Sequence, residues 1–194
     1  MTSLIRKRKK VTMFRRRPIG PGRRPVNRAK VLLMQAHRLF DEGQYLRSAL
    51  LFEKLAQGAL ERKLPRAPFL FLQAGKAYVY AGQNDRGLAP TWAGLKELAA
   101  QNRWLELERL GNKTVAELSE RGLSEASESI RKWLDEQLAG VKSQLPTGEK
   151  TSERPLLPTK CPSCGGRIDP QTVNWLDSVT VECLYCGSAV RAEN

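Results

Sequence analysis

Hydrophobic and polar positions follow a helical pattern through residues 31–139 of the chain, which are rich in Leu, Ala, Glu, Arg and Lys and poor in β-branched residues. The pattern predicts helices over residues 31–42, 45–59, 69–81, 88–100, 103–121 and 124–139. Ser124 is a favourable N-cap for the last of these helices. The sequence therefore predicts a mostly α protein over this region.

Three glycines mark the turns between pairs of these helices. Gly43, Gly82 and Gly122 are separated by 39 and 40 residues, and each lies between two predicted helices. The repeating unit is a helix, a glycine turn and a second helix. The six predicted helices are therefore expected to form three hairpins.

Small and aromatic residues recur at matching places in these hairpins, and the pattern resembles the tetratricopeptide-repeat family. The matching positions are Ala36, Gly43, Tyr45, Ser48 and Phe52 in the first unit, and Phe71, Gly75, Tyr78, Gly82 and Gly87 in the second. The third unit, with Val115, Leu118, Gly122 and Ser127, is degenerate, and residues 63–68 lengthen a connection beyond the family's period. Another six-helix bundle is the alternative. Small residues are expected where helices cross closely, with Leu50, Phe52, Leu55, Phe71 and Tyr78 filling the core.

The resemblance implies a solenoid whose first helices line a concave groove for an extended or helical segment of a partner protein. The polar groove residues that it implies are Lys30, His37, Asp41, Lys76, Arg109, Asn112 and Lys113, accompanied by Leu33, Phe40, Leu72, Val79 and Tyr80. Lys76, Arg109 and Lys113 can clamp an acidic group or a peptide carboxylate. The alternative is that these cations only solvate a helix face.

The composition changes after residue 139. Residues 140–159 contain three prolines and lose the helical pattern, so they are predicted to be a linker. Strands are expected at residues 171–176 and 179–183, joined by a turn at Asp177 and Ser178, with residues 188–191 as a third strand.

Four cysteines make the most specific motif of the chain. Cys161 and Cys164 form one CxxC pair, Cys183 and Cys186 form the other, and 18 residues separate the pairs. This spacing is typical of structural zinc sites, and residues 160–194 resemble a zinc ribbon. A module of this size cannot build a sufficient core alone, so one structural Zn²⁺ is expected to hold it together. Two disulfides, a redox CxxC and a rubredoxin-like iron site are the alternatives.

Catalysis has little support in the sequence. Four thiolates would close the coordination sphere of the metal and leave no position for a reacting water. His37 is the single histidine and is more typical of a helix surface or groove than of a general base. We therefore expect a protein that is not an enzyme and has no small-molecule substrate.

The net charge of +13 is concentrated at the start of the chain. Residues 1–30 contain 12 of the 33 Lys and Arg residues and no acidic residue, whereas the other 164 positions hold 21 basic and 20 acidic residues. The arm of basic residues comprises Arg6, Lys7, Arg8, Lys9, Lys10, Arg15, Arg16, Arg17, Arg23 and Arg24. Like charges and prolines predict disorder over residues 1–30. The apolar stretch in these residues is too short for a secretory signal. The alternative to a disordered basic arm is an organellar transit peptide.

Three functions agree with these features. The first is a cytoplasmic protein-interaction adaptor that uses the helical groove and the ribbon. The second is a nucleic-acid-associated protein whose basic arm neutralises phosphates. The third is peripheral binding of the arm to an anionic membrane surface. An integral membrane protein is not expected, because no apolar run reaches the roughly 18 to 20 residues that a spanning helix needs.

Overall fold

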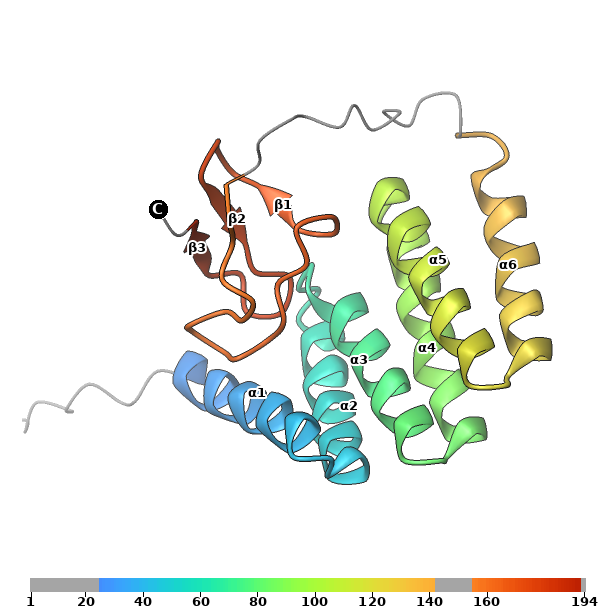
Figure 1. Ribbon diagram of the computed structural model, residues 1–194, viewed down its shortest axis with the longest axis horizontal. Helices are drawn as coiled ribbons and strands as arrows, with labels where there is room; N and C mark the ends of the chain where they lie inside the picture. The colour runs from blue at the N-terminus through green and yellow to red at the C-terminus, as the bar shows by residue number, and fades with distance from the viewer. Residues whose placement is uncertain (1–24, 142–154, 193–194) are drawn as a thin grey trace, which may run out of the picture.

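The computed structural model of the protein describes residues 25–141 and 155–192. These residues form six α-helices followed by three short β-strands (Figure 1). The helices are α1 (Pro25–Asp41), α2 (Tyr45–Glu61), α3 (Ala67–Tyr80), α4 (Asn84–Ala100), α5 (Trp104–Glu120) and α6 (Ser124–Leu138). The strands are β1 (Asn174–Trp175), β2 (Thr180–Glu182) and β3 (Ala189–Arg191). The prediction of a mostly helical protein with a small β module is confirmed.

Helix α1 corrects the predicted boundary of the basic arm. The predicted disorder over residues 1–30 is wrong for residues 25–30, which belong to α1. Arg28 and Lys30 are exposed on this helix, so their charges stay in water and do not oppose its formation. Residues 1–24, with the ten basic residues of the arm, and residues 142–154 of the predicted linker lie outside the described residues.

The start of α4 and the N-cap residue of α6 differ from the sequence-based prediction. Helix α4 begins at Asn84, before the predicted start at residue 88, and contains Pro90. Asp85 lies in its first turn, where a negative charge favours the helix. At the start of α6, Leu123 occupies the cap position and makes no side-chain cap bond, so the prediction that Ser124 is the N-cap is wrong.

The three turn glycines adopt a backbone conformation that glycine permits and other residues disfavour. Gly43, Gly82 and Gly122 have φ values of +75°, +74° and +76°, in the left-handed region that side chains disfavour. They end α1, α3 and α5 and let the chain return along the next helix. In Figure 1 the helices stand side by side in chain order from α1 to α6.

Small residues lie where helices cross, as predicted. A Cβ added to Gly75 on α3 would lie 2.8 Å from the carbonyl oxygen of Gly87 on α4, so only glycine permits this approach. Ser48 Oγ on α2 donates a hydrogen bond of 2.8 Å to the carbonyl oxygen of Ala36 on α1. Phe52, Phe71 and Tyr78 are buried, as predicted, and Leu55 is partly buried. Leu50 is 48% exposed, so the prediction that it fills the core is wrong.

The three strands form an antiparallel sheet in the order β1-β2-β3. Trp175 pairs with Val181, and Val181 pairs with Val190. The two valines are buried in the same core cluster as residues of α1 and α2, including Leu33 and Phe52. The C-terminal module therefore packs on the helices and shares their core.

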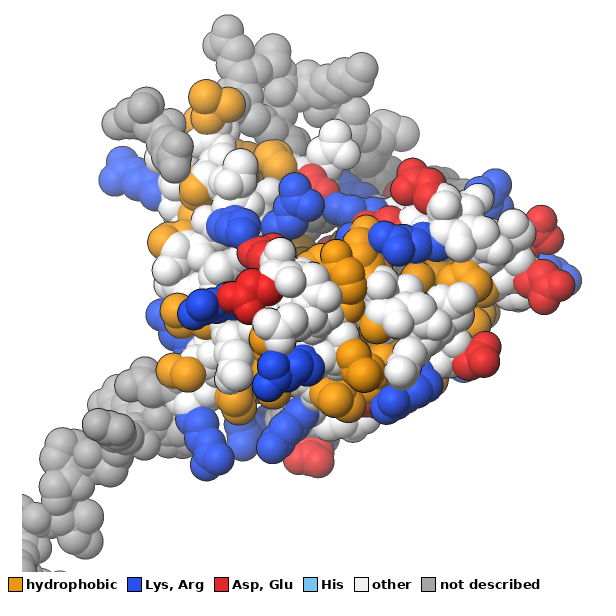
Figure 2. All heavy atoms as spheres, turned by 60° about the horizontal axis from the view of Figure 1, so that its bottom comes forward, with side chains coloured by type: hydrophobic (Ala, Val, Ile, Leu, Met, Phe, Trp, Pro, Cys, Tyr) orange, Lys and Arg blue, Asp and Glu red, His pale blue; other side chains and the backbone are white. Residues whose placement is uncertain are grey.

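Hydrophobic and charged side chains occupy different parts of the surface. Figure 2 shows hydrophobic side chains gathered in the middle of one face, with Lys and Arg and a smaller number of Asp and Glu side chains around them.

Candidate metal centre and the groove beside it

The four cysteines belong to two similar turns. The Gly165 N–H donates a hydrogen bond of 2.8 Å to the Cys161 carbonyl oxygen, and the Gly187 N–H donates one of the same length to the Cys183 carbonyl oxygen. Gly165 and Gly187 have φ values of +74° and +71°. Each CxxC-Gly segment therefore closes a tight turn whose positive φ is provided by glycine.

The sulfur atoms converge on one point between these turns. All four Sγ atoms lie within 4.8 Å of one another. The Sγ atoms of Cys161 and Cys186 are 3.7 Å apart, as are those of Cys164 and Cys183. A tetrahedral ion with metal–sulfur bonds of about 2.3 Å separates its ligands by about 3.8 Å. The four cysteines can therefore hold a single metal ion.

The thiols influence the ionisation of one another. Hydrogen bonds from Cys164 and Cys183 lower the pKa of Cys186 far below its usual value. Hydrogen bonds with Cys183 and Cys186, together with burial, raise the pKa of Cys164 far above its usual value. Because negative charge on four neighbouring thiolates is mutually unfavourable, full deprotonation requires a cation to compensate the accumulated charge.

Both CxxC turns contact the helical region at His37. The ring of Tyr185, which lies inside the second CxxC, meets the His37 ring edge to face at 4.9 Å between centroids. A Cβ added to Gly166, after the first CxxC, would lie 2.9 Å from His37 Nε2. His37 is 7% exposed, and this burial lowers its pKa from 6.5 to about 4, although Asp41 opposes the shift. The His37 ring is therefore neutral and enclosed by the module.

Further contacts attach the module to the first helix of each predicted hairpin. On α3, Gln73 Nε2 donates a hydrogen bond of 2.8 Å to the Tyr185 hydroxyl. On α5, Arg109 donates to the Gln171 carbonyl oxygen and Lys113 pairs with Asp169, both at 2.8 Å. On α1, Asp41 pairs with Lys160. The module therefore lies across the face formed by α1, α3 and α5.

The charge of Asp169 is stabilised by this arrangement. Burial opposes ionisation of its carboxyl group, but hydrogen bonds from Lys113 and from the Gln171 N–H outweigh that effect and lower the pKa of Asp169. The carboxylate therefore remains ionised beside Lys113.

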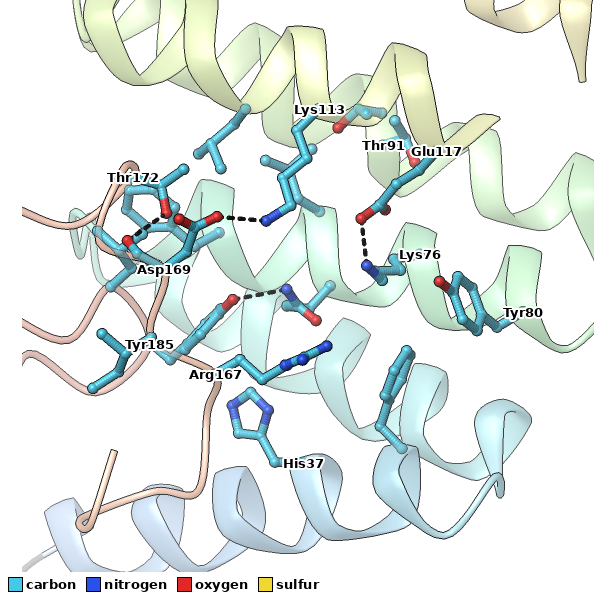
Figure 3. A pocket seen from close by; sticks show the side chains of 18 of the residues that line it. His37, Lys76, Tyr80, Thr91, Lys113, Glu117, Arg167, Asp169, Thr172 and Tyr185 are labelled. Atoms are coloured by element: carbon cyan, nitrogen blue, oxygen red, sulfur yellow. Dashed lines mark hydrogen bonds and ion pairs between the residues drawn. The ribbon is translucent and has the colours of Figure 1, made fainter. Parts of the chain in front are cut away.

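A pocket of about 510 Å³ remains between these helices and the module. Its apolar lining includes Phe40, Leu72, Val79 and Leu110. Figure 3 shows Arg167 of the module extending into the pocket between α1 and α3, and the Lys76–Glu117 and Lys113–Asp169 pairs beside it. The pocket combines an apolar lining with charged groups that come from the helices and from the C-terminal module.

The structure brings some of the predicted groove residues together. Those that line the pocket are His37, Phe40, Asp41, Leu72, Lys76, Val79, Tyr80 and Lys113. Lys30, Leu33, Arg109 and Asn112 do not line it. Leu33 is buried in the core, Arg109 bonds to the module, and Lys30 and Asn112 are exposed elsewhere.

Several residues of the pocket were missed by the sequence reasoning. They are Gln73, Glu117, Arg167, Asp169, Thr172, Leu184 and Tyr185, among others. One signal was available for two of them. Leu184 and Tyr185 are large side chains inside a CxxC turn, where metal binding alone does not require them. Such side chains indicate that the turn packs against another surface.

Comparisons of this chain with protein-family models, with curated proteins and with solved structures found no match. Within residues 25–141 and 155–192, none of the helices combines the length and the hydrophobicity needed to cross a lipid bilayer.

Proposed function

We propose that this protein is a non-enzymatic interaction adaptor whose tetratricopeptide-like concave face binds a segment of a partner protein. The observation that carries the proposal is the pocket that α1, α3, α5 and the C-terminal module enclose. Its volume of about 510 Å³ is in the range typical of ligand sites, roughly 300 to 1,000 Å³.

The pocket lining favours binding of a peptide segment. Lys76 and Lys113 are held in ion pairs with Glu117 and Asp169, and Phe40 and Tyr80 pack against each other with centroids 5.3 Å apart. An apolar lining with fixed charges fits an extended segment that inserts an aliphatic or aromatic side chain and places polar groups beside Lys76 and Lys113.

We assign the metal as one structural zinc ion and the module as a zinc ribbon. Four cysteine thiolates are a common ligand set of structural zinc, and two of the Sγ–Sγ distances, 3.7 Å each, match the spacing of ligands around a tetrahedral ion. Because these cysteines must stay reduced to bind it, we place the protein in the cytoplasm.

The groove proposal is tested by blocking the pocket from α5. Thr114 lines the pocket, whereas Asn112 lies on the same helix, is exposed and does not line it. Tagged wild-type protein, Thr114→Arg and the matched control Asn112→Arg are used to capture partners from the native cell. A groove partner is retained by Asn112→Arg and lost by Thr114→Arg. Retention of the same partners by Thr114→Arg contradicts the proposal.

Nucleic-acid binding through the basic arm is a second candidate. It is supported by the 12 basic residues and the lack of acidic residues in positions 1–30. Phosphate binding of this kind weakens steeply as salt is raised. The test is a gel shift at two salt concentrations with the full chain and with residues 1–24 deleted. A shift that persists after deletion contradicts a role for the arm.

A further inference from the structure

The two CxxC turns form part of the surface that the C-terminal module presents to the helices. Tyr185 lies between Cys183 and Cys186, contacts the His37 ring and accepts a hydrogen bond from Gln73. Gly166 follows the other CxxC pair and has no room for a side chain beside His37 and Tyr185. The conformation of the metal site therefore determines the shape of the docking surface.

The ion pairs at the edge of this interface contribute little to docking. The side chains of Lys113 and Asp169 are 48% and 34% exposed, and those of Lys160 and Asp41 are 51% and 43% exposed. Exposed pairs of this kind contribute little to stability and weaken in salt. Docking consequently depends on the packing of apolar groups, which includes the two turns against His37 and the module's buried valines against Leu33 and Phe52.

Docking also has an unfavourable component. His37 Nε2 is buried and has no hydrogen-bond partner among the described residues. Leaving a polar atom buried and unpaired opposes burial, because the atom loses its hydrogen bond to water. Separation of the module would return this nitrogen to water. Because the packing of both turns must outweigh this cost, the interface is favourable only while both turns keep their shape.

We propose that metal binding by the four cysteines holds the C-terminal module as a cover on the concave face, and that loss of the metal uncovers the face. The module has too few residues to stay folded without a metal ion. The helices contain packing of their own, such as the contact between Gly75 and Gly87, and persist without it. Loss of the module removes one wall of the pocket and opens the rest of the face. What this does to partner binding rests on the function proposed above, whereas the metal-dependent cover does not.

The accessibility of His37 tests this proposal directly. It is the single histidine of the chain, so its modification by diethyl pyrocarbonate is assigned unambiguously by mass spectrometry. Untagged full-length protein is compared with and without a zinc chelator at pH 7.5. Tyr185→Ala removes the contact with His37 and leaves the cysteines in place. Arg191→Ala, at an exposed position of β3, is the matched control.

The expected result is slow modification of His37 in metal-loaded wild type and in Arg191→Ala. Chelation and Tyr185→Ala each raise the rate by about tenfold or more, as local opening exposes the ring, with helical circular dichroism retained. Unchanged protection of His37 after metal removal overturns the proposal. Loss of the helical signal on chelation also overturns it, because a cover requires a helical face that persists. Neither measurement needs a partner, so its outcome is independent of the Thr114→Arg experiment.

Discussion

The side-chain amide of Gln73 on α3 donates a hydrogen bond of 2.8 Å to the hydroxyl of Tyr185, although the two residues are 112 positions apart. Tyr185 lies inside the second CxxC turn and Gln73 lines the pocket of the helical region. One hydrogen bond therefore joins the candidate metal centre to the candidate binding groove.

Removal of this hydrogen bond weakens the docked state without affecting the metal ligands. Tyr185→Phe keeps the ring and loses the hydroxyl, so we expect the free energy of unfolding to fall by about 1 kcal/mol. Tyr185→Ala loses the contact with His37 as well and costs more. Urea unfolding of metal-loaded protein measures both changes. Equal stability of wild type, Tyr185→Phe and Tyr185→Ala would show that Tyr185 does not anchor the module.

Gly166 has no space for even one methyl group. An added Cβ would lie 2.4 Å from Tyr185 Cδ2, so Gly166→Ala is expected to destabilise the protein by about 1 to 3 kcal/mol. Gly58 in α2 is the matched control, because no atom lies within 4 Å of its added Cβ. Gly58→Ala is expected to stabilise the helix by about 0.5 to 1 kcal/mol. Opposite shifts in thermal midpoint are predicted, and shifts of the same sign would contradict the packing described.

The close crossing of α3 and α4 depends on Gly75. A Cβ at this position would lie 2.1 Å from Thr91 Oγ1 and 2.8 Å from the backbone oxygen of Gly87. Because the second neighbour is backbone, the helices must separate, and Gly75→Ala is expected to cost at least about 2 kcal/mol. Chemical denaturation measures this loss. A variant as stable as wild type would show that the helices are not in contact here.

His37 makes stability depend on pH in a defined window. Its pKa is lowered by burial from 6.5 to about 4 in the folded protein, so the unfolded chain binds a proton more readily. The free energy of unfolding therefore falls as the pH drops from about 6.5 to about 4, by on the order of 3 kcal/mol in total, and this contribution is constant below that range.

The variant His37→Gln isolates this contribution, because it keeps every cysteine and every carboxylate. Denaturation curves at several pH values are compared for wild type and variant. The difference between their stabilities is expected to change across the window. Parallel pH profiles would show that His37 is not buried in its neutral form.

The features that the sequence could predict are those that depend on residues close together in the chain. The turns at Gly43, Gly82 and Gly122 and the convergence of the four cysteines depend on residues close together in the chain, so their patterns are visible in it. The start of α1 was missed because the charges of Arg28 and Lys30 indicated disorder, whereas on the helix both side chains remain in water.

The position of the module could not be predicted, because its contacts join distant segments. Lys113 on α5 pairs with Asp169 of the module, 56 positions away. Lys76 likewise pairs with Glu117, which comes from a different helix. Such pairings depend on how the helices and the module are placed in space, and the pattern within one helix does not contain that information.

We propose that the four cysteines hold one metal ion, which keeps the C-terminal module folded. Native mass spectrometry of the full-length chain, combined with elemental analysis and an absorption spectrum, tests it most directly. One zinc ion per chain, a colourless solution and loss of the ion in the variant Cys164→Ser with Cys183→Ser are predicted. A metal-free chain with two disulfides, or a coloured protein containing iron, would contradict the account.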